Sequence, residues 1–298
     1  MRTKLAALAL AFTLAPAGVF AGPFSAMYVF GDSLSDNGNV FAASGGTQPP
    51  PPYAQRYSNG PVAVEVVAAT WGVPLFDYAF GGATTGTENY GSPLLPGMQQ
   101  QLAMFVASTG GVADPDALFV LWGGSNDVFS ALSQGLDPTA ALAVAASNIL
   151  NMVGTLEGLG ARHVMVGGMP DLGLTPAFAG DRALGTSLTD SYNDLLQTEL
   201  LGTSARFWDV ATTMRDIVAS PAAYGMTNVV EPCLAGLVAC GTPDTYLFWD
   251  SVHPTAAGHA LLAGSLAEAA ATPVPEPASL LLFGSGLAGL MAQRRRRR

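Results

Sequence analysis

Lysine is almost missing from this chain of 298 residues: Lys4 is the only one. Residues 22–273 hold five arginines, no lysine and 21 acidic residues, so this part of the chain carries a net charge of −16. Such an acidic surface repels phosphate groups. It therefore excludes nucleic acid and anionic membrane surfaces as partners of residues 22–273.

Cysteine and histidine are also scarce, with two and three residues. Two thiols without a nearby histidine do not make a metal site, and neither a metal nor another cofactor is expected. Cys233 and Cys240 lie in the segment EPCLAGLVACGTPD. A local disulfide is the leading interpretation if the protein reaches an oxidising compartment, and the alternative is two unpaired buried thiols.

Long uncharged apolar runs occur at the two ends of the chain. Near the start, Arg2 and Lys4 precede LAALALAFTLAPAGVF, and small residues up to Ala21 suit cleavage. This order predicts a signal peptide over residues 1–21. Residues 22–273 then form one exported domain, which is long enough for a sizeable hydrophobic core.

The second apolar run, Ser279 to Ala292, is followed by five arginines. At 1.5 Å per residue it reaches roughly 21 Å, less than the roughly 30 Å of a bilayer core. Positive residues stay on the cytoplasmic side, which puts the main body of the chain outside. The alternative to a processed tail is an ordinary tail anchor.

With Pro275, Glu276 and Pro277 in front of this run, residues 274–298 resemble a PEP-CTERM sorting signal. The resemblance implies a protein of the Gram-negative cell envelope or extracellular matrix. It also implies a transient inner-membrane anchor, recognised and removed by an exosortase.

Between the two ends, short apolar segments alternate with longer amphipathic ones, which predicts an α/β fold with a doubly wound parallel sheet. Polar, Gly-rich segments follow the first three expected strands and should meet at the carboxyl edge of that sheet. A Pro-rich loop at residues 45–60 is long enough to be functional. Strands are expected at 25–30, 73–80, 116–124, 161–170 and 205–210, and helices at 60–72 (with Pro61 in its first turn), 137–159, 188–202 and 255–270.

The histidines differ in their surroundings. His163 lies in an apolar strand and is expected to be structural, whereas His259 lies inside the last helix, where a packing or surface role is expected. His253 follows Asp250 by three residues, a spacing at which a carboxylate reaches Nδ1 and leaves Nε2 free to take a proton. The alternative is that this pair only caps the last helix. Ser33, in VFGDSLSDNGN, is likewise either a nucleophile or a turn residue.

Four ordered segments resemble the signature blocks of the GDSL (SGNH) esterase and lipase family: FGDSLSDNGN, DYAFGGATTG, GGSND and YLFWDSVHPTAAGH. RYSNGPVAVE and GARHVMVGGMPDLGLTP are similar to further segments of the family. The resemblance runs from about Met27 to about Leu262. It implies a three-layer α/β/α fold with a mainly parallel five-stranded sheet, as in flavodoxin-like proteins. Asp77 departs from the family's usual asparagine, which leaves one local hydrogen bond open.

By this resemblance, Ser33 is the nucleophile, His253 the general base and acid, and Asp250 the residue that orients His253. The oxyanion donors are the backbone N–H groups of Ser33 and Gly82 and the side-chain amide of Asn126. Other polar neighbours are expected in structural roles: Asp32 and Asp36 in turns and caps, and Asp127 orienting Asn126 or capping. The four tryptophans are expected in the core: Trp71, Trp122, Trp208 and Trp249.

These observations predict an exported serine esterase or lipase that forms an acyl-enzyme on Ser33. Its substrate is a carboxylic ester: a lipid, a small acyl ester or an acetylated polysaccharide. One alternative is a carbohydrate O-acetylesterase acting on exopolysaccharide. Another is a surface-matrix protein that keeps the fold without catalysis, against which the intact set of site residues argues.

Overall fold

The computed structural model describes residues 22–271, so the signal peptide and sorting tail expected at the two ends lie outside the described residues. A five-stranded sheet with strand order β2-β1-β3-β4-β5 forms the centre, and every neighbouring pair is parallel. All five predicted strands are present, although each is shorter than expected. They are β1 (Met27–Gly31), β2 (Leu75–Asp77), β3 (Leu118–Trp122), β4 (His163–Gly167) and β5 (Arg206–Trp208).

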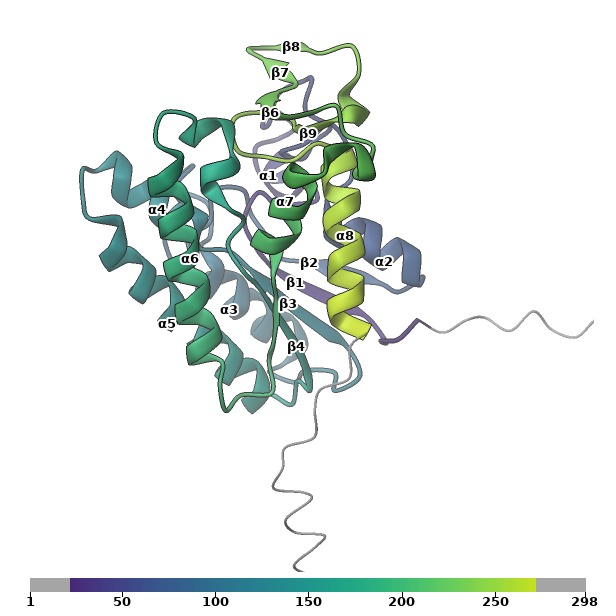
Figure 1. Cartoon of the computed structure of the whole chain (residues 1–298). Helices are drawn as coiled ribbons and strands as arrows, with labels where there is room; N and C mark the ends of the chain where they lie inside the picture. Colours follow the sequence, from purple (N-terminus) through teal and green to yellow (C-terminus); the bar gives the residue numbers. More distant parts are fainter. Residues whose placement is uncertain (1–21, 272–298) are drawn as a thin grey trace, which may run out of the picture.

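Helices cover both faces of this sheet (Figure 1). On one face, Phe119 and Leu121 of β3 pack with buried residues of α3 (Met98–Thr109), α5 (Pro138–Gly158) and α6 (Arg182–Glu199). On the other, Leu118 and Val120 pack with those of α2 (Ala63–Trp71), α7 (Val210–Ala219) and α8 (Ala256–Ala271). Alternate residues of β3 therefore belong to two hydrophobic cores, one on each face, as expected for a sheet covered on both faces. The predicted three-layer α/β/α fold is confirmed.

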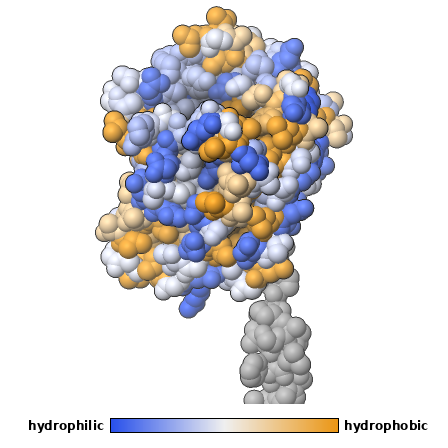
Figure 2. Space-filling model, turned by 90° about the vertical axis from the view of Figure 1, so that its left-hand side faces the viewer, coloured by the Kyte–Doolittle hydropathy of each residue, from blue (hydrophilic) through white to orange (hydrophobic). Residues whose placement is uncertain are grey.

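Two further helices begin at the carboxyl edge of the sheet, each after one of its strands. Helix α1 (Asn39–Ala43) follows β1, and α4 (Ser125–Ser133) follows β3. Apolar and hydrophilic residues are interspersed on the side of the molecule where α4 and α5 lie (Figure 2).

Two further pairs of strands lie together at the top of the view in Figure 1. Strand β6 (Asn228–Pro232) pairs in parallel with β9 (Tyr246–Phe248), and β7 (Leu234–Ala235) forms a hairpin with β8 (Val238–Ala239). A disulfide between Cys233 and Cys240 closes the base of this hairpin. The predicted pairing of the two cysteines is confirmed.

Two helix starts can be compared with their predictions. Asp137 caps α5 by accepting a hydrogen bond from Thr139 N–H at 2.9 Å, with Pro138 at the first helical position, as predicted. The expectation that Pro61 lies in the first turn of α2 is wrong, because the helix begins at Ala63 after the cap residue Val62. Glu65 accepts the free Val62 N–H at 3.0 Å and thereby fixes this later start.

Candidate active site

The structure brings Ser33, His253 and Asp250 together from opposite ends of the domain. His253 Nε2 lies 2.7 Å from Ser33 Oγ, and His253 Nδ1 lies 2.7 Å from Asp250 Oδ2. Ser33 is 8% exposed, so its hydroxyl is shielded but still borders a cavity. A hydroxyl, an imidazole and a carboxylate in this order can pass a proton from oxygen to nitrogen and stabilise the resulting imidazolium.

Hydrogen bonds within the loop after β9 fix the positions of Asp250 and His253 relative to each other. Asp250 Oδ1 accepts hydrogen bonds from the N–H groups of Val252 and His253 at 2.9 and 2.8 Å, while Trp249 N–H donates to the carbonyl of His253 at 2.7 Å. Burial raises the pKa of Asp250, but the charge and hydrogen bonds of His253 and the backbone outweigh it and hold that pKa below its ordinary value. Asp250 therefore stays ionised beside His253.

Ser33 lies in a tight turn directly after β1. The carbonyl of Asp32 accepts hydrogen bonds from the N–H groups of Ser35 and Asp36, and Asp32 Oδ1 accepts one from Leu34 N–H at 3.0 Å. Asp32 thus has the turn role expected of it. It also lines the cavity beside Ser33, and its burial raises its pKa to about 6.

The segments after β2 and β3 contribute Gly82 and Asn126 to the same cavity. Gly82 has φ +82°, and a Cβ there would lie 2.5 Å from Asn89 Oδ1, so a side chain is excluded on both grounds. Asn126 is 7% exposed, and its Nδ2 donates to the carbonyl of Ala83 at 3.0 Å. An amide nitrogen carries two N–H bonds, which leaves a second donor available.

Asp127 links two of the segments that meet at the cavity. Its two carboxylate oxygens accept from the N–H and the hydroxyl of Thr85 at 3.0 and 2.8 Å. Asp127 lies in the first turn of α4, which agrees with the capping role expected of it, whereas orientation of Asn126 stays a prediction. Its carboxylate also ties the segment after β3 to the segment after β2.

A cavity of about 380 Å³ opens beside Ser33. Its size is at the lower end of the range of small-ligand sites. Polar groups lie around the serine, and most of the remaining wall is apolar. The apolar wall residues are Leu34, Tyr57, Tyr90, Phe129, Pro170, Leu172, Ala177 and Val252.

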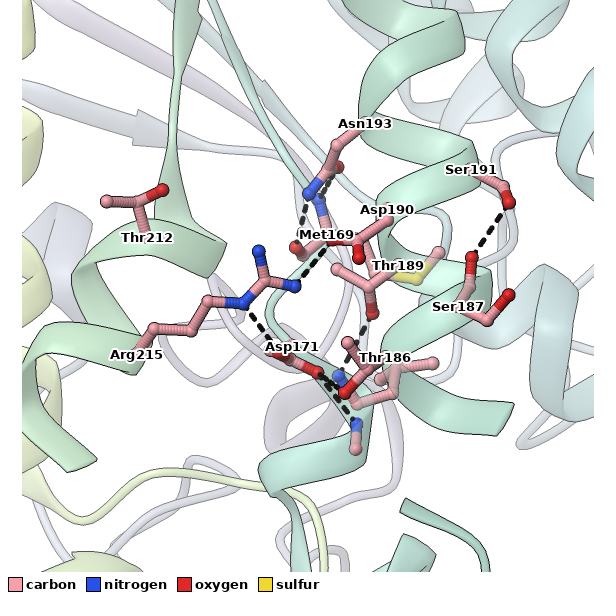
Figure 3. A network of polar contacts seen from close by, with 12 residues as sticks. Met169, Asp171, Thr186, Ser187, Thr189, Asp190, Ser191, Asn193, Thr212 and Arg215 are labelled. Carbon is pink, nitrogen blue, oxygen red and sulfur yellow. Dashed lines mark hydrogen bonds and ion pairs between the residues drawn. The ribbon is translucent and has the colours of Figure 1, made fainter. Parts of the chain in front are cut away.

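One wall of this cavity, residues 170–175, is held by an ion-pair network between α6 and α7 (Figure 3). Arg215 Nε donates to Asp171 Oδ2 at 2.7 Å, and a terminal nitrogen of Arg215 donates to Asp190 Oδ1 at 2.6 Å. Asp171 Oδ1 accepts from Thr186 Oγ1 at 2.8 Å and from Gly173 N–H at 3.0 Å. Asp171 is only 2% exposed, so these contacts offset the cost of burying its charge. The same contacts hold the wall in place.

The remaining residues singled out from the sequence have structural positions. His163 packs against the ring of Phe24, and His259 is fully buried, with its Nδ1 accepting from Ala63 N–H at 3.3 Å. Trp122, Trp208 and Trp249 are buried as expected, whereas Trp71 is only partly buried. Within residues 22–271, no group of three or more His, Cys, Asp or Glu side chains is arranged to hold a metal ion.

Two tyrosines of the Pro-rich loop were not among the predicted site residues. Tyr53 O–H donates to Asp250 Oδ2 at 2.7 Å. The ring of Tyr57 lies 5.3 Å from the ring of His253, measured between ring centres, and Tyr57 lines the cavity. The length and composition of the loop signalled a functional segment, but no pattern in it distinguishes these residues.

Comparison with known proteins agrees with this geometry. A family model described as GDSL-like lipase/acylhydrolase matches residues 27–266, and one described as PEP-CTERM protein-sorting motif matches residues 273–297. A phosphatidylcholine-sterol acyltransferase of Aeromonas hydrophila is 24% identical over 309 residues, covering 84% of this chain and 90% of that protein. A GDSL esterase/lipase of Arabidopsis thaliana is 25% identical over 320 residues, covering 83% and 91%.

A Pseudomonas putida protein is 32% identical over 307 residues and covers 88% of this chain, which spans about half (51%) of that relative's length. Among solved structures, a GDSL-like lipase from Parabacteroides merdae has a TM-score of 0.52 at 15% identity, covering 84% of this chain and 98% of that one. An acetylxylan esterase from Geobacillus stearothermophilus has a TM-score of 0.51 at 15% identity, covering 87% and 100%. At such identities the two structures show the fold alone.

The sorting motif at residues 273–297 indicates export to the cell envelope. The family match extends over most of the chain and includes every segment that meets at the cavity. The chain therefore belongs to the GDSL-like lipase/acylhydrolase family, among the carboxylic ester hydrolases.

Proposed function

We propose that this chain is an exported serine esterase that hydrolyses carboxylic esters of apolar acids through an acyl-enzyme on Ser33. The observation that carries the proposal is the unbroken hydrogen-bonded series from Ser33 Oγ through His253 to Asp250, with 2.7 Å at each step. Ser33 and His253 line the cavity of about 380 Å³, so a substrate in the cavity meets the hydroxyl directly.

In the first half of the reaction, Ser33 Oγ attacks the ester carbonyl while His253 Nε2 takes its proton. The tetrahedral intermediate collapses, the bond to the alcohol oxygen breaks, and His253 returns the proton to the departing alcohol. In the second half, His253 takes a proton from water, which attacks the acyl-enzyme. The acid then leaves, and Ser33 Oγ regains its proton.

The negative charge that develops on the carbonyl oxygen needs donors on the side of the cavity facing Ser33. We assign this role to the N–H groups of Ser33 and Gly82 and to Asn126 Nδ2. All three donors are neutral and belong to segments fixed by hydrogen bonds. Fixed donors stabilise the transition state without the cost of reorganising solvent.

The cavity supports an acyl chain longer than acetyl, because most of its wall away from Ser33 is apolar. The relative named as a phosphatidylcholine-sterol acyltransferase supports a lipid ester as substrate. An O-acetylesterase acting on exopolysaccharide needs polar groups that hold a sugar, and this wall offers few of them. The acetylxylan esterase among the structural neighbours supports only the shared fold.

The division of the chain into a signal peptide (1–21), a hydrolase domain (22–273) and a sorting tail (274–298) is part of the same proposal. The tail would hold the protein transiently in the inner membrane until an exosortase cleaves it. Mass spectrometry of the mature protein from an envelope fraction tests both boundaries. A mature protein that keeps residues 274–298 contradicts processing of the tail.

The proposed activity is tested with p-nitrophenyl acetate, butyrate and octanoate, using the full chain in mild detergent beside Ser33→Ala. Loss of the nucleophile is expected to lower kcat about 10⁴-fold or more, with the melting temperature little changed. We expect a higher kcat/KM for butyrate and octanoate than for acetate. A strong preference for acetate favours the O-acetylesterase, and no difference between wild type and Ser33→Ala contradicts the proposal.

A further inference from the structure

Asp250 accepts hydrogen bonds from two directions. Its Oδ1 accepts from the backbone N–H groups of Val252 and His253. Its Oδ2 accepts from His253 Nδ1 and from the hydroxyl of Tyr53, both at 2.7 Å. An ionised carboxyl offers about four acceptor sites, so this set leaves Asp250 fully hydrogen-bonded. Within residues 22–271, Tyr53 is the donor that comes from outside the segment 250–253.

Packing holds Tyr53 in this position. Its ring lies edge-on to the ring of Trp249, with 6.1 Å between ring centres and 83° between the planes. Trp249 is buried in a small cluster with Cys233 and Leu234, beside the disulfide. Burial raises the pKa of Tyr53 far above its ordinary value, and the charge of Asp250 raises it further. The hydroxyl therefore remains a donor wherever the protein is folded.

The loop that carries Tyr53 has two further attachments to the rest of the domain. Arg56 forms an ion pair with Glu65 of α2, and Ser58 Oγ donates to the carbonyl of Pro254 at 2.9 Å. The Pro-rich loop and the segment 249–254 thus form one hydrogen-bonded unit around the imidazole. A loop whose role was only to cover the surface would not need a contact with the carboxylate of Asp250.

We infer that Tyr53 is a positioning residue for the triad: its hydroxyl shares Asp250 Oδ2 with His253 Nδ1 and fixes the orientation of that carboxylate. This inference rests on the proposed function. Two effects follow from one hydrogen bond. The carboxylate stays aligned with the imidazole. In addition, the tyrosine hydroxyl stabilises part of the negative charge on Oδ2, so that charge stabilises the imidazolium form of His253 less.

The second effect has a sign that can be measured. Without the hydroxyl, more of the charge on Asp250 stabilises the imidazolium form of His253, and the acid limb of the pH–rate profile moves to higher pH. The other titratable groups that face His253 are Asp32 after β1, Tyr57 in the loop and His259 on α8. These groups are present in both proteins, so comparison of the variant with the wild type isolates the contribution of the Tyr53 hydroxyl.

The experiment measures kcat/KM for p-nitrophenyl butyrate between pH 5 and 9 with the full chain. Tyr53→Phe keeps the ring on Trp249 and removes only the hydroxyl. We expect kcat/KM at the optimum to fall about five- to twentyfold, mainly through kcat, and the acid limb to move up by about 0.3–1 pH unit. Tyr246→Phe is the matched control, because Tyr246 packs in the same cluster without a hydroxyl bond to Asp250, and it should match the wild type.

An acid limb that stays in place or moves to lower pH in Tyr53→Phe overturns the inference, and so does an unchanged kcat/KM. Thermal unfolding of each variant shows whether it is folded. A second pair of variants, Tyr53→Gln and Tyr53→Leu, tests the donor without the aromatic ring. Tyr53→Gln keeps a hydrogen-bond donor at this position and should be more active than Tyr53→Leu. Failure of the proposed function is distinguishable, since it appears as activity that survives in Ser33→Ala.

Discussion

Asp36 Oδ2 accepts a hydrogen bond from the backbone N–H of Gly81 at 2.8 Å, which joins the turn after β1 to the segment after β2. The other carboxylate oxygen accepts from two N–H groups of the turn itself, at 2.8 and 2.7 Å. One side chain therefore sets the spacing between Ser33 and Gly82, two of the proposed oxyanion donors.

Asp36→Asn is expected to separate these two segments. An amide presents one acceptor oxygen and one donor nitrogen, so it cannot serve both sets of N–H groups. We expect kcat on p-nitrophenyl butyrate to fall about tenfold and the free energy of unfolding to fall by about 1–3 kcal/mol. Kinetics and urea unfolding measure both. A stability loss with unchanged kcat would show that the contact serves folding alone.

Asn126→Ala tests the proposed oxyanion donor from the segment after β3. Removing one donor of this kind typically lowers kcat about 10²–10³-fold, and we expect that range here with KM little changed. Asn126→Asp is the control for shape, because the carboxylate has nearly the same size but no N–H group. It should be at least as impaired as the alanine variant. Substantial activity in Asn126→Asp would contradict a donor role.

Asp77→Asn is expected to stabilise the protein in a pH-dependent way. Burial raises the pKa of Asp77 well above its ordinary value, so the folded state favours the protonated form. The associated stability is present below the unfolded pKa, about 3.9, and is lost as the pH rises through the folded pKa. An asparagine does not ionise, and its oxygen can still accept from Ala79 N–H.

Melting temperatures of this variant and the wild type should therefore agree near pH 4. They should diverge between pH 7 and 8, where Asp77→Asn melts higher. An equal difference at both pH values would assign the effect to something other than ionisation. Although Asp77 departs from the family's usual asparagine, its Oδ1 accepts a local hydrogen bond from Ala79 N–H at 2.8 Å.

Cys233→Ser removes the disulfide that closes the β7–β8 hairpin. For so short a loop, the chain-entropy model predicts a loss of roughly 2–3 kcal/mol in the free energy of unfolding. Catalytic residues do not include either cysteine, so kcat at low temperature should stay within about twofold of the wild type. Thermal unfolding with and without reductant measures the effect. If reductant leaves the melting temperature of the wild type unchanged, the disulfide does not stabilise the protein and the prediction is wrong.

The sequence predicted those parts of the site that follow strands of strong apolar pattern. Ser33, Gly82 and Asn126 come directly after β1, β2 and β3 or one turn later, and the parallel sheet brings such segments to one edge. His253 and Asp250 were recognised because their spacing suits a local hydrogen bond, which the structure contains.

Other features depend on contacts that leave no local pattern. Tyr53 meets Asp250 across 197 residues, and an aromatic residue in a Pro-rich loop has no periodicity to mark it. The second strand was predicted over residues 73–80 but ends at Asp77, although Tyr78 and Phe80 still donate to carbonyls of the first strand's segment. Helices α1, α3, α4 and α7 were not predicted, and α4 starts within the polar GGSND segment that reads as a loop.

Ser33 and His253 are 220 residues apart, and α8, the last helix within residues 22–271, packs against α2 near the front of the domain. Residues 22–208, up to the end of β5, contain Ser33 and the three proposed oxyanion donors, but neither Asp250 nor His253. A fragment that ends before residue 250 therefore lacks the base of the proposed triad, even though it contains every strand of the central sheet. The proposed reaction thus depends on the last quarter of the domain, which lies entirely outside that sheet.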